Sequence, residues 1–93
     1  MVTVKFVGAL RHPAGRGEIT IKSGDSCSVK ALIHEIIKEL PMLEQNLIDP
    51  QLADPRPNVL ILVNGKEISV LEGLDTPVHD GDEVVFIPVV HGG

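Results

Sequence analysis

The chain has 93 residues, 43% of them hydrophobic, and carries 13 acidic against 8 basic residues, for a net charge of -5. This length suits one domain with its own hydrophobic core, and the composition is that of a globular rather than a disordered chain. The acidic balance and the presence of only two aromatic residues, Phe6 and Phe86, argue against direct nucleic-acid binding. Phosphate contacts need basic side chains, and base stacking needs aromatic rings.

No apolar run approaches the roughly 20 residues that span a bilayer, and the amino end lacks the pattern of a signal peptide. A lone cysteine, Cys27, has no internal partner for a disulfide, which is typical of the reducing cytoplasm. We therefore expect a cytoplasmic monomer that does not bind membranes. Cys27 precedes a predicted helix, whose dipole lowers a thiol pKa, but it has no second cysteine and no obvious base beside it. A half-buried structural thiol is the favoured interpretation.

Two alternating segments at the amino end predict a β-hairpin. Apolar residues occupy every second position in residues 2–6 and again at Ile19 and Ile21, the pattern of half-buried strands. Pro13, Gly15 and Gly17 between them predict a turn. We therefore expect two antiparallel strands, over residues 2–7 and 18–22.

Residues 29–40 predict one amphipathic helix. Ser28 is its expected N-cap, and Pro41 is expected to end it. His34 lies off the apolar face and is expected in solvent. The apolar residues recur at intervals of three and four and form one stripe: Val29, Leu32, Ile33, Ile36, Ile37 and Leu40.

The segment 41–58 contains four prolines and no sustained period. Loops of this length without structure are uncommon in compact domains. Leu43, Leu47 and Ile48 predict one short helical turn that folds the segment back onto the body.

The carboxyl half predicts three further strands. Residues 59–63 form a continuous apolar run of the kind found in central strands, and Asn64-Gly65 is a type I′ turn signal before a short strand near 67–70. Asp80-Gly81-Asp82 is a second turn, and residues 83–90 are the last strand. The order of elements is β-β-α-β-β-β. It predicts an α+β fold, the β-grasp of ubiquitin, in which a mixed sheet carries one main helix on one face.

The second half of the chain resembles the ubiquitin-like sulfur carriers, most closely the ubiquitin-related modifier family. The resemblance covers roughly the last 40 residues. The chain lacks that family's tryptophan after the Asn64 turn, and Pro88 is more similar to the small subunit of molybdopterin synthase and to the thiamine-pathway sulfur carrier. The sulfur acceptor, whether tRNA, molybdopterin or another molecule, therefore stays open. The residues that carry the resemblance are Arg56-Pro57, Asn64, residues 71–75, Asp80-Gly81-Asp82 and the terminal His91-Gly92-Gly93.

The resemblance implies a carrier rather than an enzyme. An E1-like activating enzyme would use ATP to adenylate the α-carboxylate of Gly93, which then becomes a thiocarboxylate or is joined to a lysine. The chain itself would supply no catalytic residue and bind no cofactor or metal. Its partners would be this enzyme, sulfur donor and acceptor proteins, or target lysines. Glycine suits the end because a Cβ would clash in a narrow channel beside ATP. Val89, Val90, His91 and Gly92 form the expected flexible docking segment, with residues 1–93 as a single domain.

The apolar strands predict a second partner surface. One helix covers only one face of the sheet, so Leu60, Leu62, Val85 and Ile87 are expected to be exposed on the other face and to mark a binding site. An alternative is that the segment 41–58 folds over this face and buries it. A second function class also stays open, a non-catalytic β-grasp module that binds proteins through the sheet.

Overall fold

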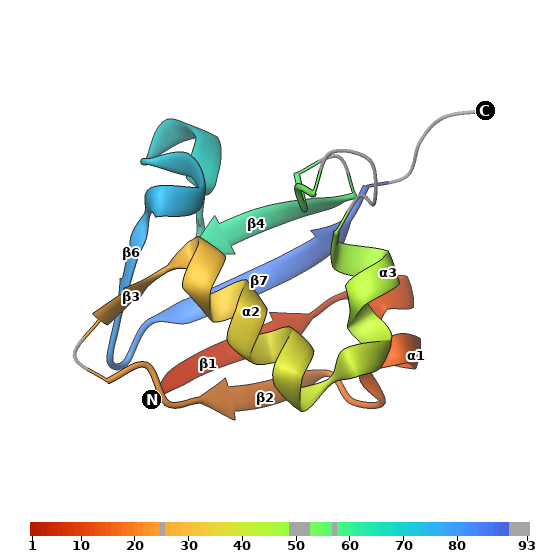
Figure 1. The fold of residues 1–93 in the computed structure, drawn as a ribbon. Helices are drawn as coiled ribbons and strands as arrows, with labels where there is room; N and C mark the ends of the chain where they lie inside the picture. The colour runs from red at the N-terminus through yellow and green to blue at the C-terminus, as the bar shows by residue number, and fades with distance from the viewer. Residues whose placement is uncertain (25, 49–52, 57, 90–93) are drawn as a thin grey trace.

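The computed structural model describes residues 1–24, 26–48, 53–56 and 58–89. Its main sheet is mixed and has the strand order β2-β1-β7-β4-β5, with β1 parallel to β7 and the other neighbours antiparallel (Figure 1). A smaller antiparallel sheet pairs β3 with β6. The strands are β1 (Val2–Phe6), β2 (Glu18–Ile21), β3 (Ser26–Ser28), β4 (Val59–Val63), β5 (Lys66–Glu67), β6 (Pro77–His79) and β7 (Glu83–Pro88).

The predicted hairpin of β1 and β2 is confirmed, but its connection is not the plain turn expected from the sequence. A 3₁₀ helix (Gly8–Leu10) runs into a short helix α1 (Arg11–Ala14). Leu10 and Ala14 are buried, and their burial in the core stabilises the helical connection. The segment is too short to show a helical repeat of apolar residues, so the sequence did not predict it. Gly15 ends α1 with a φ of 73°, a conformation that glycine adopts without strain.

Helix α2 (Val29–Glu39) crosses one face of the main sheet, as predicted (Figure 1). The side chain of Ser28 caps it by accepting a hydrogen bond from the Ala31 N–H at 3.1 Å. The apolar stripe faces the sheet: four residues of the helix are buried, and Ile37 and Leu40 are half-buried at its end. The buried members are Val29, Leu32, Ile33 and Ile36.

The described part of the segment 41–58 folds onto the body on the helix side. A 3₁₀ helix (Pro41–Leu43) leads into α3 (Glu44–Leu47), so the predicted helical turn is confirmed. Leu43 and Leu47 are fully buried in the same core as α2. Among residues 41–48, Leu43, Leu47 and the half-buried Ile48 pack into that core rather than over the opposite face of the sheet, while Met42 is 74% exposed.

The turn between β4 and β5 has positive φ at Asn64 (50°) and Gly65 (84°), as the predicted type I′ turn requires. The strand expected near 67–70 is wrong in extent. After Glu67 the chain forms a 3₁₀ helix (Ile68–Val70), because the Glu67 carboxylate accepts a bond from the Ser69 N–H and Ile68 packs into the core. Among the described residues, no helix is long and apolar enough to cross a membrane.

Candidate functional site: the root of the tail and the uncovered sheet face

Strand β7 carries the carboxyl-terminal tail and lies in the middle of the main sheet. It pairs with β1 on one side, where Phe86 lies opposite Phe6, and with β4 on the other, where Pro88 lies opposite Val59. Beyond the strand, the Val89 N–H donates to the Asn58 carbonyl at 2.9 Å. The chain is thus held on both sides almost to the point where the tail begins.

Of the predicted docking segment, the structure places only Val89, whose side chain is 41% exposed. Val90, His91, Gly92 and Gly93 lie outside the described residues, and their roles stay predictions. A shallow groove at the root of the tail contains no charged side chain. It is lined by Ala9, Leu10, Gln45, Asn46, Asn58, Pro88 and Val89.

The four predicted surface residues lie together on the face of the sheet that α2 does not cover. Leu60 lies opposite Ile87 and Leu62 opposite Val85, and the residues between them in the two strands, Ile61 and Phe86, are buried. All four side chains are partly exposed, Leu60 by 38%. The spacing of two residues within a strand puts all four on one face. Their role in binding a partner is a proposal considered below.

Val7 belongs to the same surface and was not singled out from the sequence. It follows the Phe6–Phe86 pair, donates its N–H to the Phe86 carbonyl at 3.1 Å and is 40% exposed. The register therefore sets it beside Ile87. The sequence could have indicated Val7, because the alternation of inward and outward side chains in residues 2–6 continues to this residue and places it on the outer face. We call the five side chains the outer patch: Val7, Leu60, Leu62, Val85 and Ile87.

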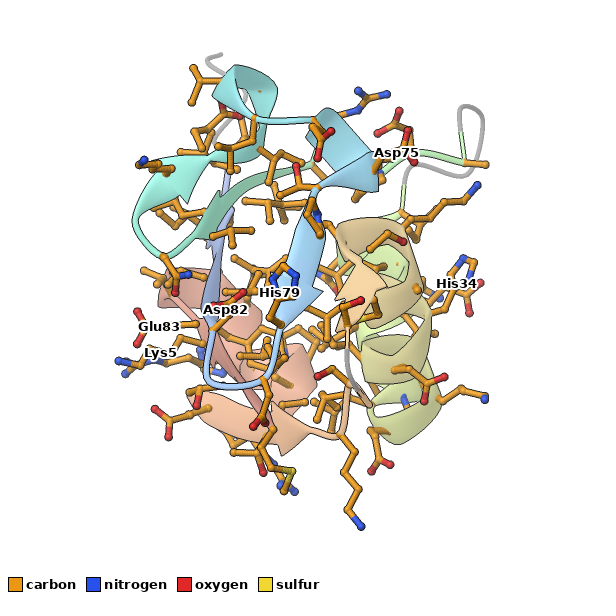
Figure 2. The ribbon with its side chains drawn as sticks, turned by 90° about the vertical axis from the view of Figure 1, so that its left-hand side faces the viewer. Lys5, His34, Asp75, His79, Asp82 and Glu83 are labelled. Carbon is orange, nitrogen blue, oxygen red and sulfur yellow. The ribbon has the colours of Figure 1, made fainter. Side chains whose placement is uncertain are left out.

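The outer patch is bounded by charge at the end away from the tail. Lys5 lies opposite Val85 in the β1–β7 pair, and its ammonium group forms an ion pair of 3.0 Å with Glu83 at the start of β7 (Figure 2). This carboxylate raises the pKa of Lys5. Both side chains are more than 40% exposed, so the pair contributes little to stability and mainly marks a polar border.

Asp82 organises the turn that precedes β7. Its carboxylate accepts hydrogen bonds from the His79 N–H at 2.8 Å and from the Asn64 side-chain amide at 2.9 Å. These two donors, the His79 backbone first, hold the pKa of Asp82 below its ordinary value. Figure 2 shows the His79 ring beside this carboxylate. The cluster lies at the opposite end of β7 from the tail and serves the fold.

The model of the ThiS family matches residues 4–93. The chain belongs to the ThiS family. Small archaeal modifier protein 3 of Haloferax volcanii is 30% identical over 90 residues, 97% of this chain and 96% of the relative. Ubiquitin-related modifier 1 of Mycosarcoma maydis is 35% identical over 74 residues, 80% of this chain and 68% of the relative. The crystal structure of Mycobacterium tuberculosis CysO superposes with a TM-score of 0.80 at 28% identity, over 97% of this chain and 100% of the other.

These matches confirm both the β-grasp fold and the resemblance to ubiquitin-like sulfur carriers and modifiers. For this ThiS-family chain, the likeness to the small archaeal modifier protein and to CysO spans nearly the full length of both proteins. The relatives are named as modifiers and as a sulfur carrier, and none of these names is that of an enzyme.

The other reactive side chains of this ThiS-family protein do not form a second centre within the described residues. Cys27 is half-buried in β3, where burial first and then Glu35 raise the pKa of its thiol. The half-buried position predicted for Cys27 is confirmed, and removal from water disfavours the thiolate. In the described part of the chain, no three His, Cys, Asp or Glu side chains gather closely enough to hold a metal ion.

Proposed function

We propose that this chain is a sulfur carrier or protein modifier that reacts through the α-carboxylate of Gly93. The observation that carries the proposal is the family match, which extends through residue 93 and so includes Gly92 and Gly93. Two relatives support this proposal by their names. Sulfur carrier protein CysO is named for carrying sulfur and small archaeal modifier protein for modifying proteins, and both reactions can follow activation of the same carboxylate. The central position of β7 supports it as well, since a firmly held strand presents the tail from a fixed point.

In the proposed reaction, an oxygen of the Gly93 carboxylate attacks the α-phosphorus of ATP, and pyrophosphate leaves. The product is an acyl adenylate. A hydrosulfide equivalent from a donor protein then displaces AMP to give the thiocarboxylate, or a lysine amine displaces AMP to give an isopeptide bond. An E1-like activating enzyme supplies the catalytic groups and binds the ATP. This chain contributes the reacting carboxylate and needs no cofactor of its own.

The outer patch is the proposed docking surface for that enzyme. Ile87 and Val89 are two residues apart, so the patch runs directly into the tail. Apolar side chains that stay in solvent on a small domain commonly mark a protein interface. The uncharged groove at the root of the tail lets the enzyme close around Val89 without desolvating an ion.

The test uses the full chain, ATP and the activating enzyme from the native host. We expect exchange of labelled pyrophosphate into ATP and, with a sulfur donor, the mass increase that replaces one oxygen by sulfur. Deleting Gly92 and Gly93 should abolish both signals and leave the melting temperature unchanged. Val70→Ala, at a side chain 74% exposed and away from the sheet face, is the control. Failure of the full chain to support exchange, or a large loss of stability on deletion, would overturn the proposal.

The outer patch also supports a second candidate function, a non-catalytic β-grasp interaction module. Such a module binds its partners through the sheet and has no need of the tail. A pull-down from the native host with and without Gly92 and Gly93 separates the two functions. Partners that are captured equally well by both forms, with no pyrophosphate exchange, would favour the module.

A further inference from the structure

Strand β2 forms one edge of the main sheet and, in the described part of the chain, pairs only with β1. The Phe6 N–H donates to the Gly17 carbonyl at 2.9 Å, and bonded pairs alternate along an antiparallel ladder. The next bonded residue of β2 is therefore Ile19. The backbone N–H and C=O groups of Glu18 and Thr20 point away from β1, toward the free edge.

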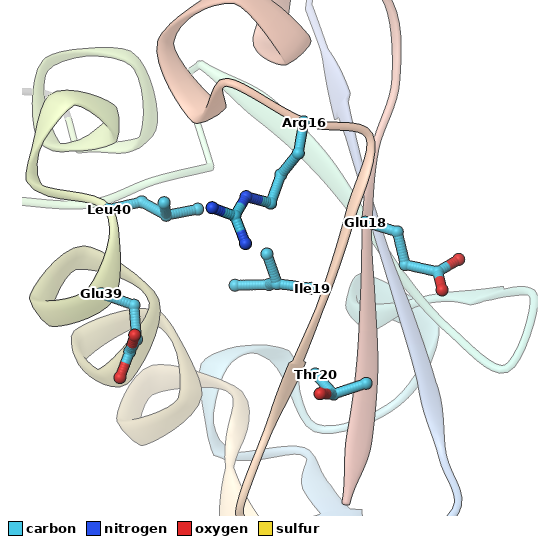
Figure 3. A pocket seen from close by; sticks show the side chains of 6 residues that line it. All are labelled: Arg16, Glu18, Ile19, Thr20, Glu39 and Leu40. Carbon is cyan, nitrogen blue, oxygen red and sulfur yellow. The ribbon is translucent and has the colours of Figure 1, made fainter.

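A groove lies between this edge and the carboxyl end of α2 (Figure 3). Ile19 and Leu40 face each other across it, and both are half-buried. The side chain of Glu18 turns away from the groove, so this residue lines it through its backbone. Edge strands in soluble proteins are usually protected by a proline, a bulge or a covering element. Residues Glu18–Ile21 contain no proline, and the face of β2 that points toward α2 borders this groove rather than a covering element. The lining residues are Arg16, Glu18, Ile19, Thr20, Glu39 and Leu40.

The lining of the groove includes one positive charge. The Arg16 guanidinium extends from the chain just before β2 toward Leu40 (Figure 3). Among the described residues, no carboxylate lies within 4.0 Å of it. Glu39 lies on the opposite wall, at the end of α2. The groove thus combines unpaired backbone groups, two apolar side chains, Ile19 and Leu40, and two opposite charges. Arg16 has no carboxylate partner on the described surface, and Glu39 lies on the other wall.

We propose that this groove binds an extended, acidic segment of a partner protein as an added strand. Main-chain bonds to Glu18 and Thr20 hold such a segment, and pockets for alternate side chains select it. In an antiparallel arrangement, a peptide residue opposite Ile19 packs on Ile19 and Leu40. The residue two positions further lies opposite Gly17, on the same face, and meets Arg16. The recognised pattern is therefore an apolar residue, any residue, then an aspartate or glutamate.

This site goes beyond the proposed carrier function. The groove is on the α2 side of the sheet and at its β2 edge, whereas the outer patch is on the other face, over β1, β7 and β4. A partner in the groove leaves both the outer patch and the tail accessible. The chain can therefore hold a sulfur donor or acceptor protein here while the activating enzyme engages Gly93.

The test is a titration of the isotope-labelled full chain with a blocked hexapeptide of threonines that carries valine at its third and aspartate at its fifth position. We expect amide shift changes at Glu18, Thr20 and Leu40. Arg16→Glu should weaken this binding about two- to fivefold, the range of a partly exposed ion pair, and should strengthen binding of the peptide with lysine in place of aspartate. Lys30→Glu, an exposed lysine elsewhere on α2, is the matched control.

Thr20→Pro provides an independent variant, because it removes an N–H of the free edge without removing a bond to β1. It should abolish binding while a thermal melt still shows a folded domain. Equal affinity of Arg16→Glu for both peptides would overturn the charge assignment. Shift changes confined to the outer patch, or concentration-dependent pairing of β2 with a second copy in place of the peptide, would overturn the site.

Discussion

Asn64 and Asp82 are 18 residues apart in the chain and are joined by a hydrogen bond of 2.9 Å from the Asn64 amide to Asp82 Oδ1. The Glu83 N–H completes the link by donating to Asn64 Oδ1 at 2.9 Å. The two bonds fasten the turn between β4 and β5 to the start of β7. One asparagine therefore fixes where the tail-bearing strand enters the sheet, at the end opposite to the tail.

Asn64 stabilises this turn in two ways that mutations can separate. It adopts the left-handed backbone conformation, with a φ of 50°, and its side chain makes the two hydrogen bonds. Asn64→Ala loses the bonds and forces alanine into the left-handed region, so the free energy of unfolding should fall by about 2 kcal/mol. Asn64→Gly loses only the bonds and should cost about 1 kcal/mol. Urea unfolding of both variants measures the difference. If alanine and glycine cost the same, the left-handed backbone contributes nothing here.

Asp82 should make stability depend on pH. Its pKa is lowered in the folded state, so its ionised form stabilises the fold above the ordinary value of 3.8, and this contribution is lost as the pH falls through the lowered pKa. Asp82→Asn should therefore reduce the free energy of unfolding by about 1 kcal/mol at pH 7. The difference from wild type should shrink as the pH falls below about 4. Asp75→Asn, at an exposed carboxylate, is the control. A gap that stays constant with pH would contradict the prediction.

The parts of the fold that were predictable have a strong period or a specific turn chemistry. The stripe of α2, the alternation of β1 and β2 and the Asn64-Gly65 turn each determine local structure from adjacent residues. Strands β3 and β6 were missed because a pair of three-residue strands has no measurable period. They form where Cys27 pairs with Val78, a residue far away in the sequence. The short helix α1 was missed because its four residues are also too few to show a period.

The candidate site was predictable to the extent that strand alternation determines which face a side chain lies on. The four predicted patch residues lie on one face because their spacing is even, and Val7 extends the set by the same rule. The raised pKa of Cys27 depends on burial by neighbours that are distant in the chain. The groove at β2 likewise depends on where the end of α2 is packed, which the periodicity of α2 leaves open.

The core packing of α2 gives a prediction with an internal control. Ile36 is fully buried, whereas Ile37, the next residue, is half-buried at the margin of the core. Ile36→Ala should lower the free energy of unfolding by ~2–5 kcal/mol, and Ile37→Ala by about 1 kcal/mol. Chemical denaturation of the two variants measures both values. Similar losses at the two positions would mean that the helix is rotated from the orientation described.

The last prediction concerns the outer patch and the activating enzyme. Leu60 is 38% exposed, so Leu60→Asp should cost only about 1 kcal/mol of stability, mainly through the poor strand propensity of aspartate. Its effect on binding should be larger, because a partner that covers the patch must bury an unpaired carboxylate against apolar groups. We expect binding to weaken at least about tenfold, the equivalent of 1.4 kcal/mol.

Val70→Asp is the matched control for this experiment. Val70 is 74% exposed in the 3₁₀ helix after β5 and lies off the sheet face, so it introduces the same charge outside the patch. A binding titration and a thermal melt on both variants separate recognition from folding. Equal binding by Leu60→Asp and Val70→Asp would mean that the enzyme does not contact the patch. A loss of folding confined to Leu60→Asp would mean that Leu60 serves the core, and the docking surface would then have to be sought at the root of the tail alone.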